Sequence, residues 1–120
     1  MNSNKKTILI VDDESSNIFA LSAVLIPRGY KCTSALNGEQ CVKVLQGRPP
    51  LDIILMDIMM PYMDGIETIK MIRQMPEYRQ TKIIVTTADD SPATKLRSRS
   101  SGADGFLIKP IDIESLEALF

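Results

Sequence analysis

Branched apolar residues form short, uninterrupted runs along the chain, and segments with a different spacing separate these runs. Runs of this length and composition are typical of strands that are covered on both faces of a sheet. The pattern predicts five strands, of which the second has the weakest apolar signal. They are expected at Thr7–Val11, Tyr30–Ala35, Leu51–Met56, Lys82–Thr87 and Gly105–Ile108.

Helical periodicity follows four of the five runs, because apolar residues there recur at every third or fourth position. The first helix is expected over Glu14–Ile26 and ends where Pro27 and Gly29 interrupt the pattern. Asp112 is the expected N-cap of the last helix. The apolar faces of three later helices are marked by Cys41, Val44 and Leu45, by Ile66, Ile69, Ile72 and Met75, and by Ile113, Leu116 and Leu119.

The segment after the fourth strand has helix signals but lacks an apolar face. Ser91 is its expected N-cap and Pro92 its first helical position. Leu96 is the only large apolar residue between Ser91 and Gly102. This helix can therefore bury little, and we predict that it is the least stable helix of the fold.

Strands and helices alternate five times with short connections, which predicts one α/β domain over residues 1–120, with a parallel sheet between two helical layers. Ligands of such sheets bind beyond the carboxyl ends of the strands, at the switch point of the topology. The pattern leaves the strand order open. In the order 2-1-3-4-5, the first and third strands are neighbours, and Asp12, Asp13 and Asp57 at their ends would meet.

Three carboxylates at one edge repel one another. A pair about 4 Å apart costs roughly 4 kcal/mol at an effective dielectric constant near 20. Protonation or a bound cation relieves this repulsion, and a solvent-facing edge favours the cation. The chain contains no histidine, so the oxygen ligands indicate a hard cation, Mg²⁺ first and Ca²⁺ second. Thr87 and Lys109 end two further strands and add a hydroxyl and an ammonium, which suits a phosphoryl group carried on an aspartate.

Four motifs lie in order at the ends of the predicted strands: VDDES at the first, LMDIMMPYMDG at the third, TTA at the fourth and KP at the fifth. In these motifs the sequence resembles the receiver domain of bacterial two-component response regulators. The resemblance covers about the whole chain. It implies a flavodoxin-like, doubly wound (βα)5 fold with the strand order 2-1-3-4-5.

The resemblance also implies how the strand ends would bind a phosphoryl group and its metal. Asp57 would be the phosphoacceptor and one ligand of Mg²⁺. Asp13 would bind the Mg²⁺ directly and Asp12 largely through water, and the backbone carbonyl of Met59 would complete the protein ligands. Lys109 would pair with a phosphoryl oxygen.

Signal output is implied by the same resemblance. The Thr87 hydroxyl would bond to the phosphoryl group, and Phe106 would be the aromatic residue that turns inward on activation. The surface of the fourth helix, fifth strand and fifth helix would then carry the signal. Lys109–Pro110 would be a cis peptide, which is inexpensive only before proline.

The partners follow from the family as well. Its phosphoryl donor is a phosphohistidine on a separate histidine kinase or histidine phosphotransfer protein, and a chain without histidine can receive the group but cannot be the donor. A downstream effector domain or protein would receive the signal. The chain would not be an enzyme beyond catalysing its own phosphorylation and dephosphorylation.

Some positions depart from the family or vary within it. Tyr62 stands where glycine is common, so the loop after Asp57 is either stiffened or shielded by it. Phe106 replaces the tyrosine of many members and has no hydroxyl. Asp89 lies two residues after Thr87, beside the path of an attacking water, where an acid either orients the water or repels the phosphate.

The composition of the chain limits its expected partners and its expected compartment. The net charge of −1 gives no indication of nucleic acid or an anionic membrane as a partner, and Lys95, Arg97 and Arg99 are expected to form a solvated helix face. Cys32 and Cys41 make no disulfide framework, and the apolar runs are too short to span a membrane, so we expect a cytoplasmic protein. Because the last helix is short and ends on apolar residues, we expect a longer chain in which an effector domain follows, with a stand-alone regulator as the alternative.

Other classes fit the sequence less well. A phosphatase of the haloacid dehalogenase type has a second aspartate two residues after the nucleophile, where this chain has Met59. A flavodoxin-type nucleotide-binding module has a first loop rich in glycine, serine and threonine, whereas this loop is acidic. A receiver fold that is not phosphorylated is the third alternative. Glu14, the last acid of the DDE run, is expected to belong to the first helix.

Overall fold

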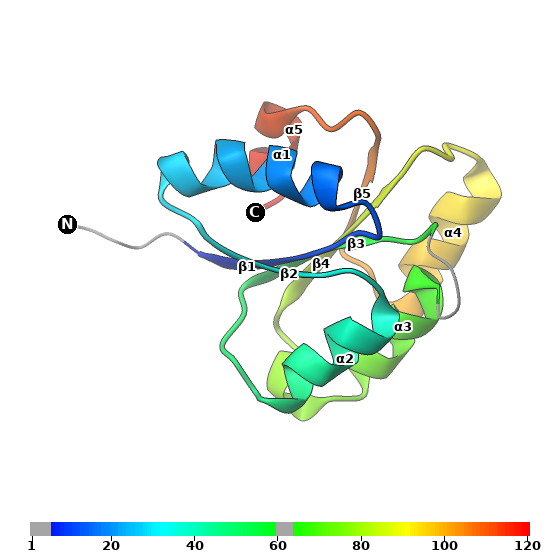
Figure 1. The fold of residues 1–120 in the computed structure, drawn as a ribbon. Coiled ribbons are helices and arrows are strands. Elements are labelled where there is room, and N and C mark those ends of the chain that lie inside the picture. Colours follow the sequence, from blue (N-terminus) through cyan, green and yellow to red (C-terminus); the bar gives the residue numbers. More distant parts are fainter. Residues whose placement is uncertain (1–5, 60–63) are drawn as a thin grey trace.

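Five strands form one parallel sheet, which organises the whole chain (Figure 1). The structure is a computed structural model and describes residues 6–59 and 64–120. The strand order is β2-β1-β3-β4-β5, so the predicted α/β class and the order 2-1-3-4-5 are both confirmed. The strands are β1 (Thr7–Val11), β2 (Lys31–Ala35), β3 (Ile53–Asp57), β4 (Lys82–Thr87) and β5 (Gly105–Ile108).

Five α-helices cover the two faces of this sheet (Figure 1). One layer consists of α1 (Ser15–Leu25) and α5 (Ile113–Ala118). The other layer consists of α2 (Gly38–Gln46), α3 (Gly65–Arg73) and α4 (Pro92–Ser101). Two short 3-10 turns, η1 (Ile26–Arg28) and η2 (Pro76–Tyr78), follow α1 and α3.

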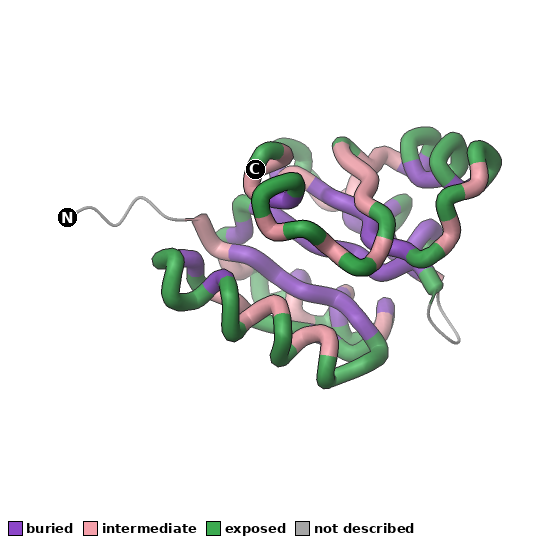
Figure 2. Tube along the Cα trace, turned by 90° about the horizontal axis from the view of Figure 1, so that it is seen from above, coloured by how far each residue is buried: buried purple, intermediate pink, exposed green. Residues whose placement is uncertain are grey.

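The three central strands are buried on both faces, which explains their uninterrupted apolar runs. Successive residues alternate between two cores: Leu9 and Val11 pack under α2 and α3, whereas Ile8 and Ile10 pack under α1 and α5. Figure 2 shows the buried strands between largely exposed helix surfaces. Burying one such side chain contributes about 1.5–3 kcal/mol, so the two cores hold the strand ends in fixed positions.

Element boundaries differ from the sequence prediction in a few places. α1 stops at Leu25, because Pro27 tightens the chain into η1, and Gly29 ends the turn with a φ of 100°. Val24, an apolar residue near the end of α1, is 37% exposed. β2 is an edge strand, and only Ala35 in it is buried, which explains its weak apolar signal.

The helix N-caps lie at residues whose side chains favour capping. The side chains of Ser91 and Asp112 accept hydrogen bonds from the backbone N–H groups of Thr94 and Ser115, as predicted. Asp64 caps α3 in the same way through Glu67. Because caps supply backbone partners that the first turn lacks, each of these residues fixes where its helix begins.

α4 is attached to the fold mainly by polar groups. Its buried residues are Thr94, Ser98 and Ser101, and Leu96 is 65% exposed. The prediction that this helix buries little apolar surface is therefore confirmed, while its low stability stays a prediction.

Arg73, at the end of α3, holds the other end of α4. Its guanidinium donates to the carbonyl oxygens of Gly102 at 2.9 Å and Thr81 at 2.9 Å, and it pairs with Asp104 at 2.7 Å. Asp104 also accepts from the N–H of Ile83 at 2.9 Å. The carboxyl end of α4 is thus tied to α3 and to β4.

In the part of the chain that the structure describes, no helix combines the length and the apolar character needed to cross a membrane.

Candidate functional site

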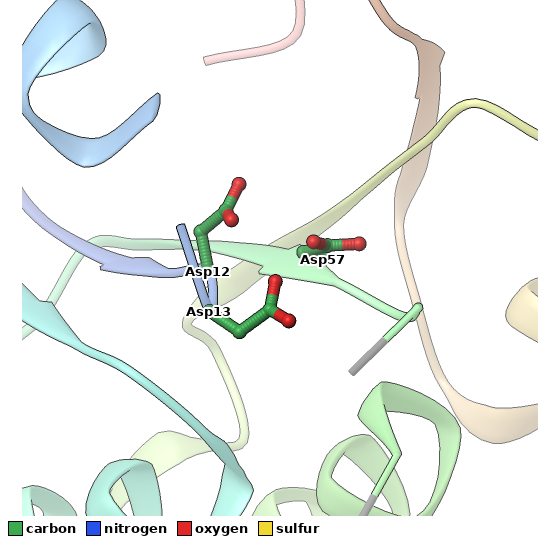
Figure 3. Close-up of side chains that lie close together, drawn as sticks. All are labelled: Asp12, Asp13 and Asp57. Carbon is green, nitrogen blue, oxygen red and sulfur yellow. The ribbon is translucent and has the colours of Figure 1, made fainter. Parts of the chain in front are cut away.

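Three carboxylates converge at the carboxyl edge of the sheet (Figure 3). Asp12 and Asp13 follow β1, and Asp57 is the last residue of β3. These strands are neighbours, with Val11 paired to Met56, so their ends lie side by side. The three side chains offer carboxylate oxygens that all lie within 4.8 Å of one another. The juxtaposition expected for the order 2-1-3-4-5 is therefore present.

Asp12 is buried and held by three donors. Its Oδ1 accepts from the N–H of Glu14 at 2.9 Å, and its Oδ2 accepts from Asn17 Nδ2 at 3.3 Å and Lys109 Nζ at 3.0 Å. Asn17 also donates to Glu14 Oε1 at 3.2 Å. Asn17 was not predictable from the sequence, because nothing in its spacing shows that the first turn of α1 faces the acids.

Glu14 is the N-cap residue of α1, so its expected place at the start of this helix is confirmed. Its side chain makes no capping hydrogen bond. Asp13, in contrast to Asp12, is exposed to solvent. The acidic edge therefore has one side that is open to an ion from solution.

Asp57 is only 3% exposed, although it carries an ionisable side chain. Its Oδ1 accepts from the backbone N–H of Met59 at 2.9 Å. Burial raises the pKa of Asp57 above its ordinary value, and the negative charge of Asp12 adds to this, whereas the bonds from Met59 and Lys109 oppose it. Burial and the charge of Asp12 therefore disfavour the ionised form of Asp57, and a positive charge near its carboxylate would stabilise that form.

Lys109 supplies one such charge from the end of β5. Its Nζ lies 3.0 Å from Asp12 Oδ2 and 3.3 Å from Asp57 Oδ2. Burial lowers the pKa of Lys109, but its hydrogen bonds and attraction to the two acids outweigh this effect and raise the pKa overall. The peptide bond between Lys109 and Pro110 is cis, as predicted.

Thr87 ends β4 and is completely buried. Its carbonyl accepts from the N–H of Lys109 at 2.8 Å, and its Oγ1 accepts from the N–H of Asp89 at 3.1 Å. Side chains alternate along a strand, and Val85 packs under α3, so Thr87 belongs to the face that α3 and α4 cover. Thr86, which pairs with Asp57, belongs to the opposite face.

Phe106 lies on the same face as Thr87. It pairs with Val85 in the sheet and packs, partly buried, against the core under α2 and α3. The ammonium of Lys95 in α4 lies over its ring, 5.7 Å from the centroid. Lys95 was expected on a solvated helix face, and this contact with an aromatic ring was not foreseen.

Gly65 lets α3 approach the end of β3. A Cβ atom at this position would lie 2.6 Å from Ile58 Cα and 2.7 Å from the carbonyl oxygen of Asp57. Only a residue without a side chain fits this contact, which explains the glycine at the end of the LMDIMMPYMDG motif. Tyr62, for which the sequence analysis offered two roles, lies outside the described residues.

The donor set of this edge suits a hard cation. Three carboxylates supply oxygen atoms, and the group of possible metal ligands found among the described residues contains no cysteine or histidine. The ammonium of Lys109, partly buried beside Asp57, also provides a positive charge and hydrogen-bond donors for the oxygens of a transferred anionic group. The arrangement can therefore bind a metal and accept an anionic group beside it.

A parallel five-stranded sheet in this order, with an acidic group at its switch point, defines a CheY-like α/β domain. A chemotaxis response regulator of Vibrio cholerae, CheY4, has this structure: the two superpose with a TM-score of 0.90 at 30% sequence identity, over 98% of this chain and 100% of that one. Residues 8–120 match the family model of the response regulator receiver domain. The chain belongs to this family, a family of signalling domains in two-component systems.

Two curated relatives carry the same domain within longer proteins. The response regulator PleD of Caulobacter vibrioides is 36% identical over 105 residues, which are 88% of this chain and 23% of PleD. The signal transduction histidine-protein kinase BarA of Shigella flexneri is 36% identical over 113 residues, 94% of this chain and 12% of BarA. The chain thus spans about a quarter or less of the length of these relatives. Membership of the receiver family decides against the phosphatase and the flavodoxin-type module.

Proposed function

We propose that the chain is a phosphorylated receiver domain in which Asp57 accepts a phosphoryl group. The observation that carries this proposal is the convergence of Asp12, Asp13 and Asp57 with Lys109 bridging two of them, in a chain of the receiver family. Burial raises the pKa of Asp57, which makes its carboxylate a stronger base and a better nucleophile. Asp12 accepts hydrogen bonds from three donors and Asp57 from two, so the carboxylate of Asp57 is the less saturated of the two buried acids.

A Mg²⁺ ion would be held at this edge by Asp13 and Asp57, by Asp12 largely through water, and by the Met59 carbonyl. The oxygen donors and the exposed side of Asp13 support this assignment. When bound, the ion would neutralise charge on the transferred oxygens.

Phosphoryl transfer would form a bond between an Asp57 oxygen and phosphorus while the bond from phosphorus to the donor nitrogen breaks. Lys109, now 3.3 Å from Asp57 Oδ2, would pair with a phosphoryl oxygen. The Thr87 hydroxyl would donate to another. No other covalent chemistry is assigned to the chain, which catalyses only its own phosphorylation and dephosphorylation.

The donor in this proposal is a phosphohistidine of a histidine kinase or a histidine phosphotransfer protein. The chain has no histidine, so the donor imidazole must come from another domain or protein. Beside Asp12 and Lys109, a groove of about 590 Å³ runs between α1 and the loop before α5, with Leu21 and Ile113 in its walls. This groove supports docking of the donor on that side of the acids.

Output would pass through α4, β5 and α5 to an effector domain or protein. Thr87 and Phe106 lie on the face that α4 covers, and the polar attachment of α4 supports its movement. We propose that residues 1–120 form one such domain. A net charge of −1 and two free thiols, Cys32 and Cys41, favour a cytoplasmic protein without nucleic-acid or membrane binding of its own.

A small phosphodonor tests the proposal directly. The protein is incubated with Mg²⁺ and acetyl phosphate, and its intact mass is measured with time. We expect a single labile phosphate, which is absent in Asp57→Asn and after removal of Mg²⁺ with EDTA. Asp90→Asn, an exposed acid near the same edge, is the control and should be phosphorylated like the wild type.

The same measurement distinguishes the remaining alternative. A receiver fold that is not phosphorylated would gain no mass under any of these conditions. Phosphate that persists in Asp57→Asn would move the acceptor to another residue and contradict the assignment of Asp57.

A further inference from the structure

One residue, Asp89, connects the Thr87 hydroxyl to α4. Its backbone N–H donates to Thr87 Oγ1 at 3.1 Å, on the side of the site. Its carboxylate faces the helix: Oδ1 accepts from the N–H of Ser91 at 2.9 Å, and Oδ2 accepts from the Thr94 hydroxyl at 2.6 Å. A hydrogen-bonded path therefore runs from Thr87 to the first turn of α4.

Capping of α4 does not require this path. Ser91 already caps the helix, because its Oγ accepts from the N–H of Thr94 at 3.3 Å. The bond between Asp89 and Thr94 adds an attachment between the helix and the loop after β4. Its acceptor is charged, and such bonds are roughly twice as strong as neutral ones.

Among the described residues, the part of α4 beyond its first turn adds few hydrogen bonds to the sheet. The buried hydroxyls of Ser98 and Ser101 bond to the carbonyls of Thr94 and Ser98, inside the helix, rather than to another element. Leu96 is largely exposed. Besides Thr94, the first turn contacts β5 through Lys95, whose ammonium lies over the ring of Phe106. Both predicted switch residues, Thr87 and Phe106, thus connect to this one turn.

The two ends of α4 are held differently. Arg73 ties the carboxyl end to α3 through Gly102, and a Cβ at Gly102 would lie 2.7 Å from Arg73 Cγ, so this contact is close. The amino end depends on hydrogen bonds that a rotated side chain can redirect. α4 can therefore pivot at its carboxyl end when its first turn is displaced.

We propose that Asp89 is a positioning residue that transmits the orientation of the Thr87 hydroxyl to the first turn of α4 through Thr94. A threonine hydroxyl has one proton and two acceptor sites. Thr87 can therefore donate to a phosphoryl oxygen and still accept from the N–H of Asp89. When Thr87 turns toward the phosphoryl group, the loop follows, and the bond from Thr94 to Asp89 moves α4. The proposal rests on the function proposed above and names the residues that carry its output.

Resting-state coupling is tested first, without any phosphoryl group. Thr94→Val keeps the shape of the side chain and removes the hydroxyl. We expect the methyl resonance of Thr87 to shift in NMR spectra, and the amides of residues 94–97 to exchange about tenfold faster, since a bond to a charged acceptor is lost. Ser98→Ala, which removes a buried hydroxyl from the same helix, should leave the Thr87 resonance unchanged.

The second test adds Mg²⁺ and beryllium fluoride as a phosphoryl mimic. The first turn of the wild-type α4 should change its amide exchange, and this response should be lost in Asp89→Ala and in Thr94→Val. Asp89→Asn keeps one side-chain oxygen as an acceptor and should restore part of the response. Asp90→Ala, at the exposed neighbouring acid, should respond like the wild type. Phosphate uptake from acetyl phosphate should persist in Thr94→Val and Asp90→Ala, because Asp57 and Lys109 are intact.

Failure of the positioning role is distinguishable from failure of the proposed function. The role of Asp89 is refuted if Thr94→Val and Asp89→Ala respond like the wild type, or if Ser98→Ala loses the response equally. The role of Asp89 is also refuted if the Thr87 methyl resonance does not shift in Thr94→Val. That measurement needs no phosphate. A wild-type protein that takes up no phosphate contradicts the proposed function instead.

Discussion

Asp57 is buried, whereas the role proposed for it as a nucleophile requires an ionised carboxylate. Burial raises its pKa in the folded protein, and the charge of Asp12 adds to this effect. A raised carboxyl pKa means that the folded state binds more protons than the unfolded state in the range between the two pKa values. The contribution of Asp57 to stability is therefore full below the unfolded pKa and is lost as the pH rises through the folded pKa.

Replacing Asp57 with asparagine should stabilise the metal-free protein at neutral pH. Asn removes the buried charge and keeps the shape, so the free energy of unfolding should rise by on the order of 1 kcal/mol. The gain should disappear in acid, where the carboxyl of Asp57 is protonated in both states. Urea unfolding in EDTA at several pH values measures this. Asp90→Asn should show no such gain, and a loss of stability at neutral pH in Asp57→Asn would contradict the prediction.

At the scale of residues, the sequence revealed the side chains whose place is set by the backbone. Asp12, Asp13 and Asp57 lie at strand ends, so strand order alone brings them together. Asn17, and the contact of Lys95 with Phe106, depend instead on which way a helix turn faces and which rotamer a side chain adopts. Single-residue spacing carries no such information, and for Asp89 it indicated nearness to the site but not the bonds to α4.

Among the elements, α3 illustrates how a helix position depends on a missing side chain. Its first residue, Gly65, lies against the backbone at the end of β3. The amino end of α3 therefore fixes the carbonyl of Asp57 and the start of the loop that contains Met59.

Gly65→Ala should displace that loop. The new Cβ would overlap with backbone atoms of Asp57 and Ile58, which cannot rotate away, so unfolding should require about 1–3 kcal/mol less. Phosphate uptake from acetyl phosphate should also slow, because Asp57 and Met59 shift. Chemical denaturation and intact-mass kinetics measure the two effects.

Gly47→Ala is the matched control. Gly47 follows α2, and a Cβ there meets only the carbonyl oxygen of Val44, at 3.4 Å. This variant should fold and react like the wild type or be slightly more stable. Equal losses in both variants would mean that glycine flexibility, rather than the contact of Gly65 with β3, explains the effect.

Helix starts were predictable because a cap is a local pattern, and Ser91, Asp64 and Asp112 all cap as their positions indicate. Helix ends were less so. α1 gives way to η1 at Ile26, because Pro27 changes the hydrogen bonding of the preceding turn. The attachment of α4 through Arg73 was not predictable, since it joins residues that are far apart in the chain.

Across the whole molecule, the helices differ in how firmly they are held. α5 is tied to the region before β2, where Glu117 pairs with Arg28 and accepts from the Tyr30 hydroxyl at 2.8 Å. α2 buries Cys41 and Leu45 in the core. Within the described part of the chain, α4 is the helix whose buried residues all carry hydroxyl groups, whereas α3 buries isoleucines beside Thr68.

Amide exchange with Mg²⁺ and beryllium fluoride should therefore change mainly in residues 88–108, which include α4 and β5. Residues 41–46, in α2, should keep their rates, because Cys41 and Leu45 hold this part of the helix in the core. Asp57→Asn with the same additions is the control and should show no change in either region. Uniform protection over the whole chain would indicate simple stabilisation by the ligand and would contradict output through α4 and β5.

The fold as a whole was predictable because strands that alternate with amphipathic helices are compatible with only a few sheet topologies. The motifs shared with the receiver family then indicated one of them. The movement that would carry a signal was not predictable in the same way. It is a change between two conformations of the same sequence, and the pattern of apolar and polar residues indicates only one fold.

The bridge that Lys109 makes between Asp12 and Asp57 has one more consequence. The acidic edge contains its own tethered counter-ion, so the domain keeps its acids neutralised in part while no metal is bound. A divalent ion that enters must compete with an ammonium that cannot diffuse away. Such competition would weaken binding of the ion and speed its exchange, and it would leave Lys109 free to pair with an anion that arrives together with the ion.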